Sequence, residues 1–266
     1  MEIFLGVMVF ILGMCVGSFI NMVEYRLAYR EKLIRATTRV AHTVGAGLMP
    51  ARSFCDFCGR QLKWFDNIPV ISWLVNGGKS RCCGKKLPLL YPIVELLTGI
   101  LFVLCFYYLS TYLLLFLSCL ILGLLVFEAV FDFKYMIIPD ITAFSLIVLA
   151  GLRWITIGMP TLNIICALIS ALFIFILHKI KIKGKEAMGD GDILLALFMG
   201  LFLGFPNTIV AFYLAFIVGA VIGGILIVKK KVERLSPIPF GPFLILGTVM
   251  AYFWGEKIRQ ILEIRF

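Results

Sequence analysis

Long apolar runs make up most of the chain, and short polar segments separate them. A membrane-spanning helix needs about 20 apolar residues, and most of the runs approach this length. The sixth run is short and broken by glycine, which is typical of a helix inside a bundle beside a polar cavity. The pattern predicts an all-α polytopic membrane protein with about eight transmembrane helices. The eight runs are residues 2–23, 89–108, 111–131, 141–158, 161–179, 191–205, 207–228 and 238–255.

The composition agrees with this class. Hydrophobic residues make up 62% of the 266-residue chain and charged residues only 15%, whereas an ordinary soluble domain carries more charge. The first run is too long for a signal-peptide core and lacks a basic segment before it, so we expect a retained helix. The predicted domains are a first transmembrane helix (1–23), a cytoplasmic cysteine-containing domain (24–88), a seven-helix membrane core (89–256) and an external tail (257–266).

The positive charges indicate the orientation. Of the 25 Lys and Arg residues, 21 lie in 24–88, at the last residue of the fifth run or in the segments after the third, fifth and seventh runs. With eight spans these segments share one side, which the positive-inside rule assigns to the cytoplasm, and both termini are then external. This role of the charge accounts for the net charge of +10 without a nucleic-acid partner.

Four aspartates lie at the predicted cytoplasmic ends of the membrane helices: Asp132, Asp140, Asp190 and Asp192. Two carboxyl groups held close together share one proton, so that one serves as a general base on water and the other as a general acid. This is the chemistry of aspartic proteolysis. The alternative is helix capping, which suits Asp140 and Asp190. Asp132 ends a helix, where the helix dipole disfavours an anion.

Four cysteines lie in the polar segment: Cys55, Cys58, Cys82 and Cys83. Four thiolates in a short cytoplasmic segment are typical of a structural zinc site, and a disulfide is disfavoured on the reducing face. The alternative is a degenerate site with partial or no metal. The other cysteines, Cys15, Cys105, Cys119 and Cys166, lie in apolar runs, where cysteine behaves as a small hydrophobic residue. His42 and His178 are isolated, and we expect ordinary surface or interface positions for them.

Six short motifs occur in order along nearly the whole chain. They are GSFINMVEYRL (17–27), NIPVISWL (67–74), YPIVEL (91–96), DFKYMIIPD (132–140), EAMGDGD (186–192) and PFGPFL (239–244). Together they resemble the motifs of the type IV prepilin peptidase family, whose members are GxGD membrane aspartic proteases. The GxGD signature corresponds to Gly189, Asp190, Gly191 and Asp192.

The resemblance implies roles for individual residues. Asp132 and Asp192 match the catalytic pair, and Asp140, Asp190, Gly189 and Gly191 match supporting positions. One departure is Leu194, where the family usually has lysine two residues after the catalytic aspartate.

The resemblance also bears on the cysteines, because the family has two CxxC pairs. Cys83 then matches the last ligand, and Ser80 stands where the third would be, so that Cys82 is the substitute.

The function that the resemblance implies is cleavage of the basic leader of prepilins or pseudopilins, after glycine and before an apolar helix, for a type IV pilus or type II secretion. S-adenosylmethionine-dependent N-methylation of the new N-terminus follows in many members, and no glycine-rich nucleotide loop supports it independently here. The implied location is the bacterial cytoplasmic membrane, with the active site at the cytoplasmic face. Alternatives are an ion-coupled transporter, for which the chain lacks inverted repeats, a non-catalytic pilus or secretion assembly component, and a presenilin-like protease.

Overall fold

The computed structural model describes residues 1–31, 53–55, 57–158, 160–182, 185–186, 188–229 and 238–261. His42, most of the basic early part of the polar segment and the last residues of the predicted tail lie outside these ranges. The chain forms two compact units, Met1–Ser110 and Thr111–Phe266, and each is described by itself.

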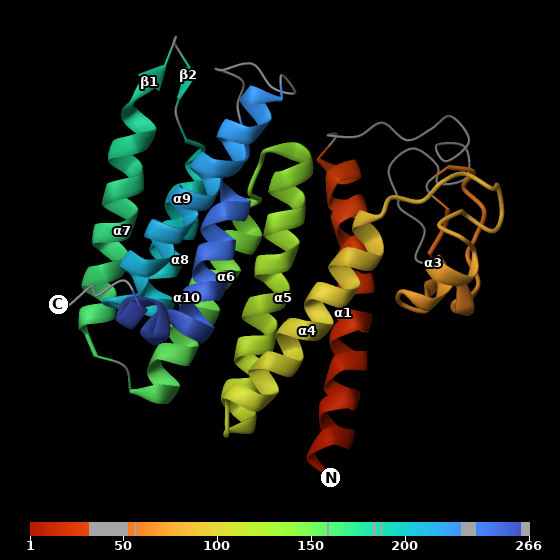
Figure 1. The fold of residues 1–266 in the computed structure, drawn as a ribbon, viewed down its shortest axis with the longest axis horizontal. Helices are drawn as coiled ribbons and strands as arrows, with labels where there is room; N and C mark the ends of the chain where they lie inside the picture. The colour runs from red at the N-terminus through yellow and green to blue at the C-terminus, as the bar shows by residue number, and fades with distance from the viewer. Residues whose placement is uncertain are drawn as a thin grey trace. The chain divides into compact units, whose positions relative to one another are not determined.

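The first unit contains two long helices and a small folded segment between them (Figure 1). The long helices are α1 (Glu2–Arg30) and α4 (Leu90–Tyr108). The segment between them carries a 3-10 turn, η1 (Trp64–Asn67), and the short helix α3 (Ile71–Val75). Two isolated bridges, Phe54–Gln61 and Lys79–Lys86, close two small loops within it.

Glycines allow α1 and α4 to approach closely. A Cβ atom at Gly13 would lie 2.8 Å from the Cα atom of Gly99, and one at Gly17 would lie 2.7 Å from the Cα atom of Glu95. Small residues four apart let two membrane helices bring their backbones together, where van der Waals packing holds them. The N-terminal motif therefore begins at a helix–helix contact.

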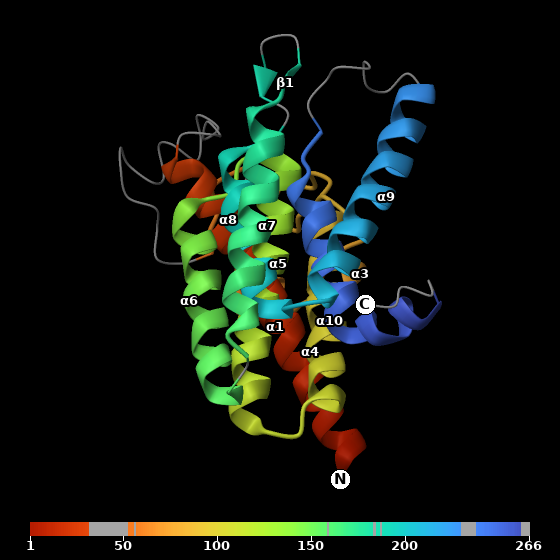
Figure 2. The same cartoon turned by 90° about the vertical axis from the view of Figure 1, so that its left-hand side faces the viewer.

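The second unit is a bundle of six helices whose direction alternates along the chain (Figures 1 and 2). One end of the bundle therefore gathers the ends of α5, α7 and α9 with the starts of α6, α8 and α10. A two-residue hairpin, β1 (Lys181–Ile182) with β2 (Lys185–Glu186), joins α7 to α8 at that end. The helices are α5 (Tyr112–Tyr135), α6 (Asp140–Ile157), α7 (Leu162–Lys179), α8 (Asp190–Leu203), α9 (Asn207–Val228) and α10 (Gly241–Ile261).

Helix α8 lies at the centre of this bundle and contacts α6, α7, α9 and α10. Leu195, Phe198 and Met199 are fully buried. A Cβ atom at Gly200 would lie 2.5 Å from the Cα atom of Ala167 on α7. At 1.5 Å per residue its 14 residues extend about 21 Å, less than the roughly 30 Å of a hydrocarbon core. The short, enclosed helix matches the prediction for the sixth run.

The prediction of an all-α polytopic membrane protein is confirmed. Six helices among the described residues are long and apolar enough to cross a membrane: α1, α4, α5, α6, α7 and α9. The two other predicted spans, 191–205 and 238–255, form α8 and α10 but do not meet that criterion. Helix α8 is too short, and α10 ends in a charged stretch that includes Glu256, Lys257 and Arg259.

The contact between α1 and α4 gives a first prediction. Replacing Gly17 by alanine places a methyl group against the α4 backbone and should destabilise the protein by about 1–3 kcal/mol, the usual effect of overpacking. Thermal unfolding of the full chain in detergent measures this. Gly224→Ala is the control, because a Cβ atom there meets nothing within 4 Å. Equal melting of the two variants would contradict the close contact.

Candidate functional site

The helix ends gathered at one end of the second unit carry its buried acids. Asp132 lies in the last turn of α5 and is 5% exposed. Its Oδ2 atom accepts a hydrogen bond from the backbone N–H of Gly241, 3.0 Å away, at the start of α10. The first N–H groups of a helix have no partner within the helix. The start of α10 therefore supplies the donor that the end of α5 does not.

Asp192 lies in the first turn of α8 and is 6% exposed. Its Oδ2 atom accepts a hydrogen bond from the backbone N–H of Gly189 at 3.1 Å. The charges of Asp192 and Asp132 lie close enough to interact. The structure thus brings together the two aspartates that the sequence analysis paired.

Two glycines leave room for this arrangement. A Cβ atom at Gly191 would lie 2.6 Å from the Cβ atom of Ile138, and one at Gly241 would lie 2.6 Å from Oδ2 of Asp132. Ile138, in the connection between α5 and α6, also lies 3.2 Å from that Gly241 position. The starts of α8 and α10 therefore pack on the same side chain, and any residue larger than glycine would push them away from the acids.

The two other predicted aspartates differ from the pair because both are exposed. Asp190 Oδ1 lies 3.4 Å from Nε2 of His178, which is buried, and Nδ1 of His178 lies 2.8 Å from the carbonyl oxygen of Met188. The side chain that receives the cap N–H of α8 belongs to Asp192, not to Asp190. Asp140 lies in the first turn of α6 and Asp190 in the first turn of α8, where a negative charge suits the helix dipole.

Two residues near the paired aspartates were not predicted from the sequence. His178 was considered isolated, yet it ties the end of α7 to the segment before α8. Glu128 lies one turn before Asp132 on α5 and is fully buried. Its place within an apolar run was a usable signal, since ionisable residues inside membrane helices mark functional sites by default.

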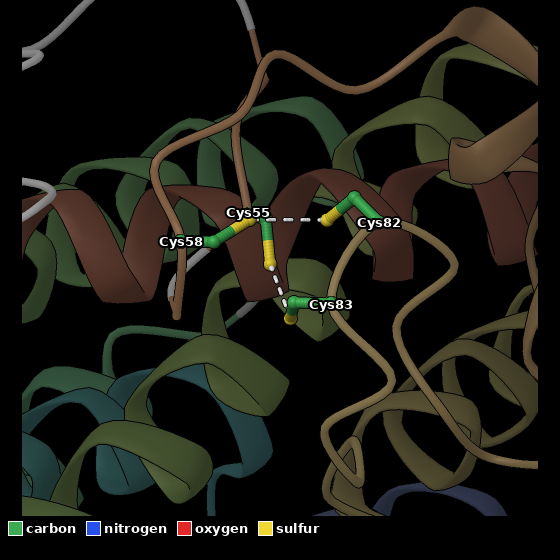
Figure 3. Close-up of side chains that lie close together, drawn as sticks. All are labelled: Cys55, Cys58, Cys82 and Cys83. Carbon is green, nitrogen blue, oxygen red and sulfur yellow. Dashed lines mark hydrogen bonds between the residues drawn. The ribbon is translucent and has the colours of Figure 1, made fainter.

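The four cysteines of the first unit form a cluster (Figure 3). Their Sγ atoms all lie within 4.8 Å of one another, with Cys58 and Cys82 at 3.2 Å and Cys55 and Cys83 at 3.8 Å. Tetrahedral zinc with Zn–S bonds of about 2.3 Å would separate its sulfur ligands by roughly 3.8 Å. The cluster could hold a metal ion after small shifts of its side chains.

Two loops of the same backbone form carry these thiols. In the first, Cys55 N–H donates to Arg60 O and Gly59 N–H donates to Cys55 O, both at 2.9 Å. In the second, Ser80 N–H donates to Lys85 O and Gly84 N–H donates to Ser80 O, both at 2.7 Å. The glycines have matching φ angles of 71° and 70°.

In this correspondence Ser80 occupies the position in the second loop that Cys55 occupies in the first, and Cys83 is equivalent to Cys58. The Oγ atom of Ser80 lies 3.2 Å from the Sγ atoms of both Cys55 and Cys82. Cys82 is thus the thiol outside the repeated loop pattern, and it reaches the place where Ser80 offers only a hydroxyl.

The two adjacent thiols have different acidities. The backbone N–H of Lys85 lowers the pKa of the Cys83 thiol to about 7, whereas burial raises the pKa of the Cys82 thiol to about 12. Because a metal binds thiolates, binding at this cluster must release the proton of Cys82.

A cavity of about 170 Å³ lies beside the cysteine loops in the first unit. Its lining includes the carboxylates of Asp66 and Glu95 and the aromatic rings of Tyr25, Trp73 and Tyr91. Two buried polar atoms among its lining residues, Asn21 Oδ1 and Trp73 Nε1, have no hydrogen-bond partner within the described chain. Such atoms at a cavity indicate a polar ligand or water.

The carboxylate of Glu95, in the cavity lining, stabilises an unusual backbone conformation at Val70. Glu95 Oε2 accepts a hydrogen bond from the N–H of Val70 at 2.7 Å. Val70 has a φ angle of 61°, which a β-branched residue rarely adopts, and such residues cluster at ligand and switch sites.

The six sequence motifs divide between these two sites. GSFINMVEYRL, NIPVISWL and YPIVEL all contribute to the cavity lining. DFKYMIIPD, EAMGDGD and PFGPFL meet around the paired aspartates. Each compact unit therefore has one candidate site.

A bundle of membrane-length helices with two neighbouring buried aspartates at one end defines the class, a polytopic membrane protein with a carboxyl pair suited to acid–base chemistry. Residues 11–109 match the family described as Bacterial Peptidase A24 N-terminal domain, and residues 119–224 match the Type IV leader peptidase family. The chain belongs to the type IV leader peptidase family.

Curated relatives cover nearly the whole chain. Proteins named Prepilin leader peptidase/N-methyltransferase from Xanthomonas campestris pv. campestris and Bacillus subtilis are 31% and 30% identical to it. The alignments span 93% of this chain and 90% of the first relative, and 94% of this chain and 94% of the second. One from Pseudomonas aeruginosa is 29% identical over 94% of this chain and 90% of its own length. No solved structure matches the chain significantly.

The repeated cysteine loops give a second prediction. We expect one zinc per chain in the wild type and its loss in Cys82→Ser, because only three thiols then remain. Adding Ser80→Cys to that variant should restore four thiols in two matching loops and recover one zinc per chain. Elemental analysis of purified protein measures the metal content. Cys119→Ser, on α5, is the control and should leave it unchanged. Full zinc retention by Cys82→Ser alone would contradict the assignment.

Proposed function

We propose that the chain is an aspartic leader peptidase that cleaves prepilins or pseudopilins, as the names of its relatives say of them. The proposal rests on the pair of buried aspartates, Asp132 and Asp192. Each accepts a hydrogen bond from one backbone N–H group, and the two lie close enough for their charges to interact. Two such carboxyl groups in a poorly solvated site share one proton. They then supply a base and an acid at the same place.

The chemistry follows from that shared proton. The ionised carboxylate removes a proton from a water molecule, whose oxygen attacks the scissile carbonyl carbon. The protonated partner gives its proton to the departing amine nitrogen as the C–N bond breaks. The products are a leader carboxyl group and a new N-terminal amine. The former base now holds the proton taken from water, and transfer of this proton to the former acid restores the starting state of the pair.

The charge distribution supports a cytoplasmic location of this site in a bacterial cytoplasmic membrane. Lys134 lies in the last turn of α5, at the acidic end of the bundle. Further lysines follow α7 and α9 in the sequence, after the helix ends that lie at the same level. Cationic segments remain in the cytoplasm under the positive-inside rule. A basic leader that has not crossed the membrane would meet the acids on that side, with its apolar helix held in the bilayer.

The catalytic assignment gives a third prediction. Asp132→Asn and Asp192→Asn should each lower leader cleavage by at least about 100-fold, the lower range for loss of general acid–base catalysis. The assay uses full-length protein in detergent with a prepilin that has a basic leader ending in glycine, and mass spectrometry detects leader loss. Asp140→Asn and Asp190→Asn are matched controls that should stay within a few-fold of the wild type. Undiminished cleavage by either member of the pair would refute the dyad.

A second activity is favoured by the cavity of the first unit. We propose that it binds S-adenosylmethionine, which supplies a methyl group for the new N-terminal amine. This ligand combines a cationic sulfonium and ammonium, a ribose diol and an aromatic base. The carboxylates of Asp66 and Glu95 can bind the cationic groups and the hydroxyls, and the rings of Tyr25 and Trp73 can stack on the base. An aromatic ring also attracts a cation placed over its face. The cysteine cluster, as a zinc site, would hold Cys55 and Ser80 in the cavity wall.

The cavity assignment gives a fourth prediction. Trp73→Phe keeps an aromatic ring but removes the buried N–H, and it should weaken S-adenosylmethionine binding by about 3- to 10-fold, as expected for one hydrogen bond. Equilibrium dialysis with labelled ligand measures binding directly, without any methylation assay. Trp64→Phe is the control, because Trp64 is 79% exposed and absent from the cavity lining. Equal binding by the two variants would argue against this cavity, and leader cleavage should be unchanged in both.

A further inference from the structure

Glu128 is a buried acid that the proposed cleavage does not yet use. It is fully buried on α5, four residues before Asp132, and side chains four residues apart lie on the same helix face. Neither carboxyl oxygen has a hydrogen-bond partner within the described parts of the chain. The Asp132 carboxyl group and the hydroxyl of Thr142 on α6 lie near enough to act on its charge.

These surroundings favour the neutral acid. The Thr142 hydroxyl donates its only proton to the carbonyl oxygen of Pro139 at 2.8 Å, so it has none to offer a carboxylate. Glu128 forms no ion pair among the described residues, and its charged neighbour, Asp132, has the same sign. A buried carboxylate with neither a donor nor a cation is strongly disfavoured.

A neutral carboxylic acid carries an O–H donor that needs an acceptor. Hydrogen bonds to an ionised acceptor are about twice as strong as those between neutral groups, so an Asp132 carboxylate is a better acceptor than the Thr142 hydroxyl. Asp132 also accepts a hydrogen bond from the N–H of Gly241. A second donor from Glu128 would favour the ionised state of Asp132. The opposing influence on the pair is His178, which lies near enough for a positive charge on its ring to favour the ionised state of Asp192.

We propose that Glu128 is a positioning residue that stays protonated and donates its O–H to Asp132, so that Asp132 is the ionised base and Asp192 carries the shared proton. The inference rests on the proposed proteolysis and assigns the roles within its acid pair. Glu128 does not exchange its proton during the reaction. It acts only through the charge state of Asp132.

Two substitutions separate this role from a structural one. Glu128→Gln keeps the shape and an N–H donor, so cleavage should stay within about 3-fold of the wild type with an unchanged pH profile. Glu128→Met keeps an unbranched chain but has no donor, so kcat should fall by about 10- to 100-fold, as expected for loss of a hydrogen bond to a charged group. KM should not change. The acidic limb of the kcat/KM profile should move to higher pH, because Asp132 loses a donor that favours its ionised form.

Thermal unfolding controls for damage to the fold. Glu128→Met removes one buried hydrogen bond, so the melting temperatures of the variant and the wild type are compared and cleavage is assayed where both are fully folded. Loss of cleavage by Glu128→Met with unchanged melting therefore reports on the site and not on folding.

Infrared spectroscopy tests the protonation state without any cleavage. The spectrum of the wild type minus that of Glu128→Gln should contain the carbonyl stretch of a protonated carboxylic acid at pH 8. Asp132→Asn should move this band to higher frequency, because an amide is a weaker acceptor than a carboxylate, and Asp140→Asn should leave it in place. This result stands even if the chain cuts no prepilin.

Each measurement can overturn the proposal. Absence of the band at pH 8 would show that Glu128 is ionised, and a band insensitive to Asp132→Asn would show that the donor points elsewhere. Wild-type cleavage by Glu128→Met would remove the positioning role. An acidic limb that moves to lower pH in Glu128→Gln would identify the loss of a negative charge and not of a neutral donor.

Discussion

The candidate protease site depends on the unpaired N–H groups at helix starts. A carboxylate buried in a helical membrane bundle needs donors, and the interior of a helix has none to spare. Alternating helix directions bring the starts of α8 and α10 to the level where α5 ends. Gly189 and Gly241 then donate to Asp192 and Asp132. Without the alternation, Asp132 would lie at a helix end with an unfavourable dipole and no donor.

The division of the chain into two units matches a division of chemistry. The first unit places acids, aromatic rings and unpartnered polar atoms around a cavity beside a thiol cluster. The second places carboxyl groups where membrane helices meet. A leader peptidase that also methylates must handle the same N-terminal segment twice, first as a peptide bond and then as an amine. Separate sites of different polarity suit these two tasks, because one requires shared protons and the other a cationic methyl donor.

Much of this arrangement could be predicted from the sequence. The apolar runs predicted the helices and placed four aspartates at one level of the membrane, since both depend on local patterns. The resemblance to the family motifs then selected Asp132 and Asp192 from the four. The role of Glu128 could not be predicted in this way, because it depends on the side chain that α6 places beside it, the Thr142 hydroxyl. The capping bond from Gly189 to Asp192 was not predicted, because a cap depends on side-chain direction as well as position. Asp192 points back to Gly189, whereas Asp190 points out to His178.

The hydrogen bond between Glu95 and Val70 has a consequence for the cavity. It links a residue of the long helix α4 to a left-handed residue in the loop before α3, a conformation that costs on the order of 1–3 kcal/mol. A ligand that competes for the Glu95 carboxylate removes the support for that conformation. Filling the cavity and reshaping the loop are therefore linked equilibria, and the strained residue makes the cavity responsive to its occupant.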